Sequence, residues 1–136
     1  MPIKKGLVSL LEYLSENEIK FTVATSSHEN TARHYFEKAG ISHYFEKIMS
    51  GEKVEKGKPD PQIYLRAAEL LQLEAKECVV LEDSLYGIES AHRAGMTPIM
   101  VPDLIRPTEE AKNMAFCVVE DLQEAKNVIK MLTEVE

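Results

Sequence analysis

The 136-residue sequence has few cysteines, a deficit of positive charge and no long apolar run, and each shortage excludes a class of protein. Its formal net charge is -7, so it lacks the basic stripe with which proteins grip nucleic-acid phosphates. Its two cysteines, Cys78 and Cys117, lie in apolar runs, which is typical of small core residues and not of a disulfide framework or zinc site. No apolar run approaches the length of a membrane span, and no signal-peptide apolar region follows Met1. We therefore expect a soluble, cytoplasmic protein that binds neither nucleic acid nor membrane.

What the sequence does contain is an alternation of short apolar runs and segments of helical periodicity. Hydrophobic residues make up 44% of the chain, enough for one domain with a real core. The alternation predicts an α/β fold, a three-layer Rossmann-like parallel sheet with helices on both faces, and a single domain over residues 1–136. The expected helices cover residues 4–17, 28–39, 61–71, 84–95, 109–112 and 122–132, and the expected strands cover residues 21–24, 47–50, 78–81, 97–101 and 115–119. A loop is expected over residues 103–107, and Pro98 favours an edge position or the first residue of its strand.

Two adjacent carboxylates, Glu82 and Asp83, follow the valine-rich run that begins at Cys78. That run predicts a strand buried on both faces, and Ser84 can cap the helix after it. Ligands of open α/β sheets bind at the carboxyl ends of the strands, and adjacent acids there favour a hard divalent cation, which predicts Mg²⁺. The alternative is a capped helix whose N-terminus is stabilised by Asp83.

Two further strand ends carry polar residues suited to one task. Thr25 and Ser26 end the first strand beside a helix N-terminus, which is typical of an anion site, although a simple helix cap is the alternative. Lys58 precedes a proline in a stiff loop, where an ammonium can neutralise a phosphate, although a solvated surface charge is the alternative. Hydroxyl, ammonium and metal together predict a site that stabilises a phosphoryl group during transfer.

These motifs resemble those of the haloacid dehalogenase-like (HAD) hydrolases, in the subgroup of β-phosphoglucomutase and small sugar-phosphate phosphatases. Residues 22–27, Thr-Val-Ala-Thr-Ser-Ser, are similar to the second family motif. Residues 57–61, Gly-Lys-Pro-Asp-Pro, with Tyr64 are similar to the third, and residues 81–96, which begin Leu-Glu-Asp-Ser, are similar to the fourth. The resemblance runs from about Ile3 to the C-terminus.

The resemblance implies a HAD-like fold and a role for each motif. It implies that Thr25, with Ser26, binds the transferring phosphoryl group and that Lys58 is the motif lysine, so Thr25 and Lys58 are the expected catalytic residues. It also implies that Glu82 and Asp83 bind Mg²⁺ and that the substrate is a small phosphorylated metabolite.

The sequence departs from the family at its front. Family members carry a first motif, Asp-x-Asp-Gly-Thr, whose first aspartate becomes phosphorylated, and a cap domain follows it. This chain contains no Asp-x-Asp. We therefore expect the C-terminal part of a longer hydrolase, inactive alone, with the aspartyl-phosphate chemistry belonging to the parent protein.

The missing motif implies a missing strand. In the family that strand lies between the strand that ends at Thr25 and the strand that ends at Asp83. Unpaired buried backbone groups cost about 1–3 kcal/mol each. We therefore expect either that the two strands close up and pair directly or that another chain fills the slot, for example in a strand-swapped homodimer.

Two other functions stay open at this point. A non-catalytic α/β domain of the same fold could bind a partner or an anion, which would fit a product without the nucleophile. A phospho-receiver domain fits less well, because it needs its acceptor aspartate in mid-chain and its threonine and lysine late in the chain. Which phosphorylated metabolite is the substrate is not predicted, since the resemblance implies that the cap selects it.

Overall fold

The computed structural model describes residues 5–102 and 107–134, and most of the expected loop over 103–107 lies outside these ranges. The main helices are α1 (Leu7–Glu16), α2 (Glu29–Ala39), α3 (Gln62–Leu71), α4 (Leu85–Arg93), α5 (Glu109–Met114) and α6 (Leu122–Glu134). The strands are β1 (Ala24–Thr25), β2 (Met49–Ser50), β3 (Val79–Glu82), β4 (Thr97–Met100) and β5 (Cys117–Val118). Short 3₁₀ turns lie at Ser42–Tyr44, Gly51–Lys53 and Ala75–Glu77.

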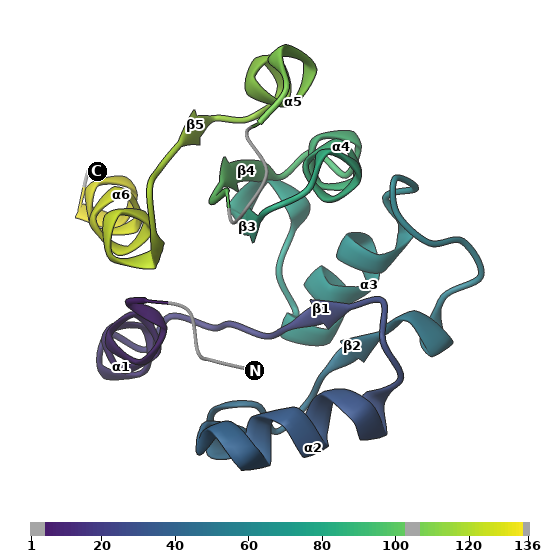
Figure 1. Ribbon diagram of the computed structural model, residues 1–136, viewed down its shortest axis with the longest axis vertical. Helices are drawn as coiled ribbons and strands as arrows, with labels where there is room; N and C mark the ends of the chain where they lie inside the picture. The colour runs from purple at the N-terminus through teal and green to yellow at the C-terminus, as the bar shows by residue number, and fades with distance from the viewer. Residues whose placement is uncertain (1–4, 103–106, 135–136) are drawn as a thin grey trace.

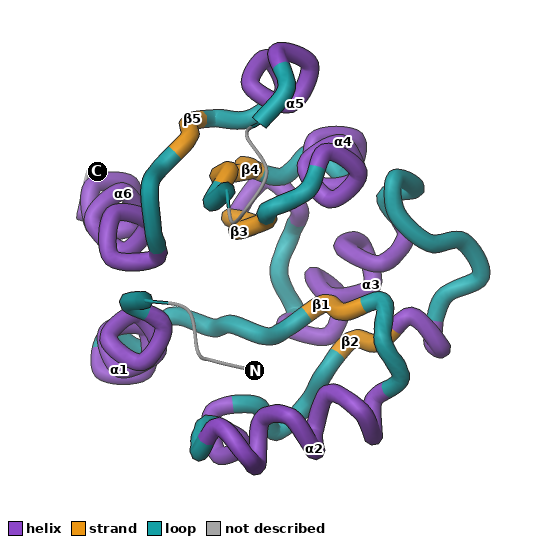
Figure 2. The backbone as a smooth tube through the Cα atoms, viewed as in Figure 1, coloured by secondary structure: helices purple, strands orange, loops and turns teal. Residues whose placement is uncertain are grey.

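The described strands form two separate parallel sheets; Figure 1 draws the strands as arrows and Figure 2 as orange segments of the tube. β1 pairs with β2, and the second sheet has the order β3-β4-β5. The α/β fold with parallel strands is therefore confirmed. Of the two alternatives expected for the missing strand, direct pairing of the strands before Thr25 and Asp83 is wrong, because β1 and β3 lie in different sheets; filling of the slot by another chain stays a prediction.

Capping residues explain where the helices beside the sheets begin and end. α2 ends at Gly40, whose φ of 76° is a left-handed conformation that glycine adopts without a Cβ penalty. α4 begins after Ser84, whose Oγ accepts a hydrogen bond of 3.1 Å from the backbone N–H of Gly87. The helix predicted over residues 84–95 ends earlier, at Arg93, so Gly95 lies beyond its last residue.

Pro98 is the second residue of β4, the central strand of its sheet, so the prediction of an edge position or of the first residue is wrong. The strand tolerates it because β5 pairs with β4 only from Ile99 onward. The Pro98 carbonyl accepts a hydrogen bond of 2.7 Å from the N–H of Phe116, on the side of β5. The missing N–H of Pro98 points to the same side, where the ladder has not yet begun.

The core lies in two main layers, on opposite faces of β3. Val80 packs in a buried cluster with Ile63 and Ala67 of α3, whereas Leu81 packs against Leu14 of α1 and the α6 side chains. The strand is nevertheless less buried than predicted: Val79 is 37% exposed, and Leu81 is only partly buried. β3 therefore has helices on both faces and an edge that no described strand covers.

A cavity of about 810 Å³ lies between the two sheets. Two unbroken stretches of chain line it, residues 18–26 leading through β1 and residues 77–83 leading through β3. Side chains of α1, α3 and α6 complete its walls. The figures place α1 and α6 side by side at one end of this space, in agreement with their packing. No helix among the described residues is long and apolar enough to cross a membrane.

Candidate functional site

The site is organised around the carboxylate of Glu82 at the end of β3. Its Oε2 accepts hydrogen bonds from Lys58 Nζ at 2.8 Å and from the Tyr64 hydroxyl at 2.6 Å. Its Oε1 accepts from the backbone N–H of Asp83 at 3.0 Å and from the Ser84 hydroxyl at 3.2 Å. Both oxygens of this carboxylate are thus fully engaged by donors of the same chain.

Lys58 reaches Glu82 from the loop before α3, and two contacts hold that loop in place. The buried Ser90 of α4 donates its hydroxyl to the Asp60 carbonyl at 2.6 Å, and Asp60 Oδ1 accepts from the N–H of Gln62 at 3.0 Å. The Lys58 ammonium also lies 5.1 Å from the centre of the Tyr64 ring, within cation–π range. The loop therefore delivers a fixed ammonium to the end of β3.

Gly87 lets the first turn of α4 approach Glu82 closely. A Cβ built on Gly87 would collide with the Glu82 carboxylate carbon. Because the Glu82 side chain is held by four donors, it has no easy way to move aside. Glycine at this position is therefore a steric requirement of the site.

The electrostatics of Glu82 and Tyr64 are consistent with an ionised acid and a neutral phenol. Burial tends to raise the pKa of Glu82, but the charge of Lys58 and the hydrogen bonds from Lys58, Tyr64 and Asp83 outweigh it and hold the pKa well below its usual value. Burial first, and then the Glu82 charge, raise the pKa of Tyr64 far above its usual value. Tyr64 thus stays protonated and donates.

The hydroxyl residues lie at the end of β1, on the other side of the cavity. Thr25 Oγ1 accepts a hydrogen bond of 3.1 Å from the N–H of Ser27, and a Cβ on Gly51 would lie 2.6 Å from the Ser26 carbonyl oxygen. All five residues predicted for the site line this one cavity: Thr25, Ser26, Lys58, Glu82 and Asp83. The structure thus brings Lys58 and Glu82 into direct contact and places the two hydroxyls on the facing wall.

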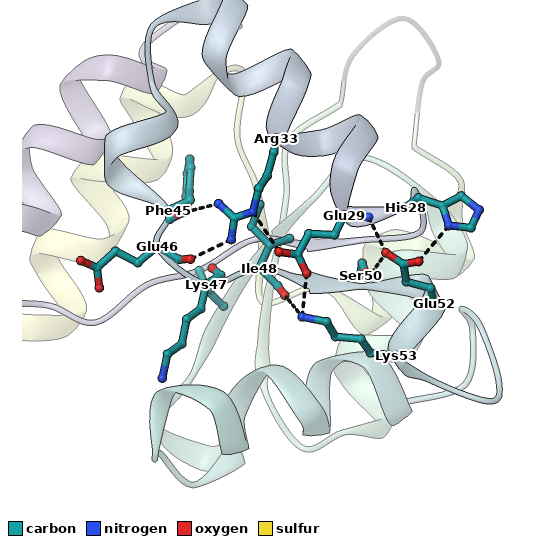
Figure 3. Close-up of polar contacts among 11 residues, drawn as sticks. His28, Glu29, Arg33, Phe45, Glu46, Lys47, Ile48, Ser50, Glu52 and Lys53 are labelled. Carbon is teal, nitrogen blue, oxygen red and sulfur yellow. Dashed lines mark hydrogen bonds and ion pairs between the residues drawn. The ribbon is translucent and has the colours of Figure 1, made fainter.

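The N-terminus of α2, expected to help bind an anion, already has an anionic partner. Glu52 Oε1 accepts from the N–H of Glu29 at 2.8 Å, and its Oε2 lies 3.1 Å from His28 Nδ1, as Figure 3 shows. A phosphate at this edge would therefore rely on Thr25 and Ser26 and not on the first N–H of α2.

The residues present do not make a metal site by themselves. Within 5–102 and 107–134, no group of three or more His, Cys, Asp and Glu side chains could hold a metal ion. Glu82 is committed to Lys58 and Tyr64, which leaves Asp83 as the exposed carboxylate of the pair. Mg²⁺ is usually bound by one or two carboxylates together with water and phosphate oxygens. These residues could contribute to such a centre but do not complete one.

Sequence reasoning missed two roles in the site. Tyr64 was recognised only as part of a motif, and its hydroxyl proves to share the Glu82 oxygen with Lys58. Ser90 was not singled out, and a buried hydroxyl on an apolar helix face was the signal that could have revealed it.

The two cysteines differ in position: Cys78 lines the cavity, whereas Cys117 of β5 is not among its lining residues.

Comparison with known proteins gives consistent matches. Residues 1–101 match the family described as haloacid dehalogenase-like hydrolase. A phosphorylated carbohydrates phosphatase of Thermotoga maritima is 30% identical over 130 residues, which cover 96% of this chain and 59% of that protein. Hexitol phosphatase A of Escherichia coli is 38% identical over 96 residues, covering 71% of this chain and 44% of that protein. The crystal structure of β-phosphoglucomutase from Clostridium difficile superposes with a TM-score of 0.78 at 26% identity, over 96% of this chain and 58% of that one.

These matches span nearly all of this chain but less than two thirds of each relative. They agree with the resemblance that the three motifs indicate and with the parallel α/β architecture. The chain belongs to the haloacid dehalogenase-like hydrolase family.

Proposed function

We propose that these 136 residues are the phosphate-handling part of a phosphatase or phosphomutase that acts on a small phosphorylated metabolite in the cytoplasm. In this proposal they form one partial core domain. Thr25 and Ser26 bind the phosphoryl oxygens, Lys58 neutralises their charge, and Glu82 and Asp83 belong to a Mg²⁺ centre. The names of the relatives, a phosphorylated carbohydrates phosphatase and a hexitol phosphatase, support this substrate class.

The observation that carries the proposal is the Lys58–Glu82 pair on the wall of the cavity. The Lys58 side chain is only 16% exposed and that of Glu82 only 11% exposed, so neighbouring residues hold the ammonium in place. One of its N–H groups serves Glu82, and an ammonium has three. The remaining donors can serve phosphoryl oxygens while Glu82 fixes the position of the amine.

In this proposal Mg²⁺ binds only to the completed site, because the described residues of this chain do not form a metal site by themselves. When bound, Mg²⁺ would neutralise developing charge on the phosphoryl oxygens. Asp83 is the residue of this chain best placed to contribute a ligand, because its carboxylate is exposed beside the cavity. Glu82 contributes first of all by holding Lys58.

Under this proposal the isolated chain is inactive, because the chain contains no Asp-x-Asp to supply the nucleophile and the general acid/base. The test is to join a strand that ends in Asp-x-Asp-Gly-Thr to the N-terminus through a Gly/Ser linker and to measure hydrolysis of an aryl phosphate with added Mg²⁺. We expect turnover from the joined protein and none from the isolated chain.

Two controls make this experiment specific. Asn in place of the first aspartate of the added strand removes the nucleophile, and Lys58→Met removes the ammonium at nearly constant length, so both should abolish turnover. Turnover by the isolated chain, or turnover that survives the Asn control, would overturn the proposal.

The alternative is a non-catalytic α/β domain that binds a partner or an anion. It is favoured by one observation: both Glu82 oxygens are satisfied within the chain, as expected for a structural ion pair. A joined protein that folds and binds inorganic phosphate but never turns over would support this alternative.

A further inference from the structure

Ser90 makes an unusual hydrogen bond for a buried serine inside a helix. A serine hydroxyl in that position commonly bonds back to the carbonyl four residues earlier in its own helix. Ser90 is 0% exposed, and its hydroxyl donates instead to the Asp60 carbonyl at 2.6 Å, 30 residues away in the sequence. The bond therefore joins α4 to the loop that carries Lys58.

Asp60 uses all three of its polar groups, each with a different partner. Its N–H donates to the Gly57 carbonyl at 3.0 Å, which closes a four-residue turn with Lys58 inside it. Its carboxylate accepts from the N–H of Gln62 at 3.0 Å, at the start of α3, and its carbonyl accepts from Ser90. Asp60 therefore ties the turn around Lys58 to α3 and to α4 at once.

α4 also contacts the acid that Lys58 binds. The Ser84 hydroxyl, at the start of α4, donates to Glu82 Oε1 at 3.2 Å, and a Cβ on Gly87 would collide with the Glu82 side chain. Ser90 follows Gly87 by three residues, so the two lie on one face of the helix. That face contacts Glu82 directly and the Lys58 turn through Ser90, so the regular helix backbone sets the spacing between the two partners of the ion pair.

Lys58 needs this support because its ammonium is carried by a flexible four-carbon stem. The contact with Glu82 restrains one N–H but does not by itself fix the backbone from which the stem starts. At a site of phosphoryl transfer, displacement of a group by about 1 Å can cost about a hundredfold in rate. The position of the turn therefore decides whether the remaining N–H donors meet a phosphoryl oxygen.

We infer that Ser90 is a positioning residue for Lys58: its bond to the Asp60 carbonyl fixes the turn against α4 and thereby fixes the place of the ammonium. Ser90 is not among the residues that line the cavity, so it acts through the turn and not by contact with a ligand there. What the ammonium binds rests on the proposed function, whereas its fixed place does not.

The first test measures the mobility of the Lys58 ammonium in the full chain. The protein is labelled with isotope-enriched lysine, and NMR relaxation gives the order parameter of the Lys58 side-chain nitrogen. Lys58→Met assigns the signal by removing it. Ser90→Ala should lower the order parameter by about half, because the turn loses its tie to α4. A Lys58 nitrogen that stays as ordered as in the wild-type chain would overturn the inference.

Thr22→Val is the matched control, because it also removes a hydroxyl that donates to a distant backbone carbonyl. Thr22 Oγ1 donates to the Lys47 carbonyl at 2.8 Å, and valine keeps the β-branched shape of the side chain. This variant should leave the order parameter of Lys58 unchanged. An equal decrease in the two variants would indicate a general loosening of the chain and would overturn the inference.

Ser90→Cys replaces Ser90→Ala if the alanine variant does not fold. The thiol stays close to the hydroxyl in size but is a weaker donor. Lys58 should again be less ordered than in the wild-type chain. Equal order in the cysteine variant and the wild-type chain would count as a refutation.

The second test uses the joined protein described for the proposed function, with an aryl phosphate and Mg²⁺. Ser90→Ala should lower kcat by about tenfold and change KM by less than about twofold, because positioning acts on the transition state more than on binding of the substrate. A loss confined to KM, or an unchanged kcat, would overturn the inference. A joined protein that never turns over would overturn the proposed function, and the order parameter of Lys58 would then decide the inference by itself.

Discussion

Two groups of charged residues in this protein differ in how deeply their side chains are buried. The Glu82 cluster, made of Lys58, Tyr64 and Glu82, brings an ammonium and a phenol to one oxygen in a nearly buried position. The α2 network, made of His28, Glu29, Arg33, Glu52 and Lys53, spreads its charges over the start of α2 and the turn after β2 (Figure 3).

The α2 network has more ion pairs but more contact with solvent. Glu29 binds Arg33 Nε at 2.9 Å and Lys53 Nζ at 2.8 Å, and Arg33 also donates to the Phe45 and Glu46 carbonyls. These contacts tie α2 to the chain that leads into β2. The His28 side chain, in contrast, is 78% exposed.

The number of ion pairs therefore does not predict which of the two regions contributes more to stability. Exposed pairs contribute little, because water and salt screen them. Loss of one partner from a buried pair is costly, because the other charge is left without compensation. The small Glu82 cluster should therefore be the more sensitive of the two.

The largest effect is expected from Glu82→Ala, which leaves Lys58 without its carboxylate and Tyr64 without its acceptor. We expect a loss of about 3–5 kcal/mol in the free energy of unfolding, measured by urea denaturation. Lys58→Met in the same background should restore part of it, since it removes the uncompensated charge. If Glu29→Ala destabilised the protein as much as Glu82→Ala, the ranking of the two regions would be wrong.

A smaller effect is expected from Tyr64→Phe, which removes one donor to a charged acceptor while Lys58 remains. We expect a loss of about 1.5–3 kcal/mol in the free energy of unfolding. Tyr86→Phe is the matched control, because Tyr86 is 61% exposed and should change stability little. Equal losses in the two variants would mean that the Tyr64 hydroxyl does not stabilise Glu82.

The smallest effect is expected from acid titration of the α2 network. The hydrogen bond from the Glu29 N–H and the contact with His28 lower the pKa of Glu52 below its usual 4.5. A carboxyl whose pKa is lowered by folding stabilises the protein above the unfolded pKa, and this is lost as pH falls through the folded pKa.

Glu52→Gln should therefore flatten the loss of stability below about pH 4.5, measured as the urea midpoint against pH. The difference from the wild-type chain should shrink in 1 M salt, where the screening length is about 3 Å. A salt-independent difference would show that the network is less open to solvent than the structure indicates.

The sequence was sufficient for the order of elements, and the five residues that it predicts for the site line one cavity. Periodic leucines predicted α1, and the Ser84 cap and the polar ends of β1 and β3 were visible as local patterns. Local patterns carry this information because capping and amphipathicity depend on residues only a few positions apart.

What the sequence did not predict depends on distant pairing. The sequence left open whether β1 and β3 pair directly or stay apart, since nothing within either strand determines what lies beside it. The exposure of Val79 follows from that separation, and the central position of Pro98 depends on where β5 begins. The bond from Tyr64 to Glu82 joins residues of different elements, so spacing alone did not reveal it.

Because Cys78 borders the cavity, the reactivity of its thiol can report whether the cavity is filled. Burial, with a contribution from the Glu77 charge, raises the pKa of the Cys78 thiol, and burial likewise raises that of Cys117, so both should alkylate slowly at neutral pH. Only the first of them borders the space between the sheets. The ratio of the two alkylation rates therefore measures occupancy of the cavity in the unsubstituted protein, with Cys117 as the internal reference.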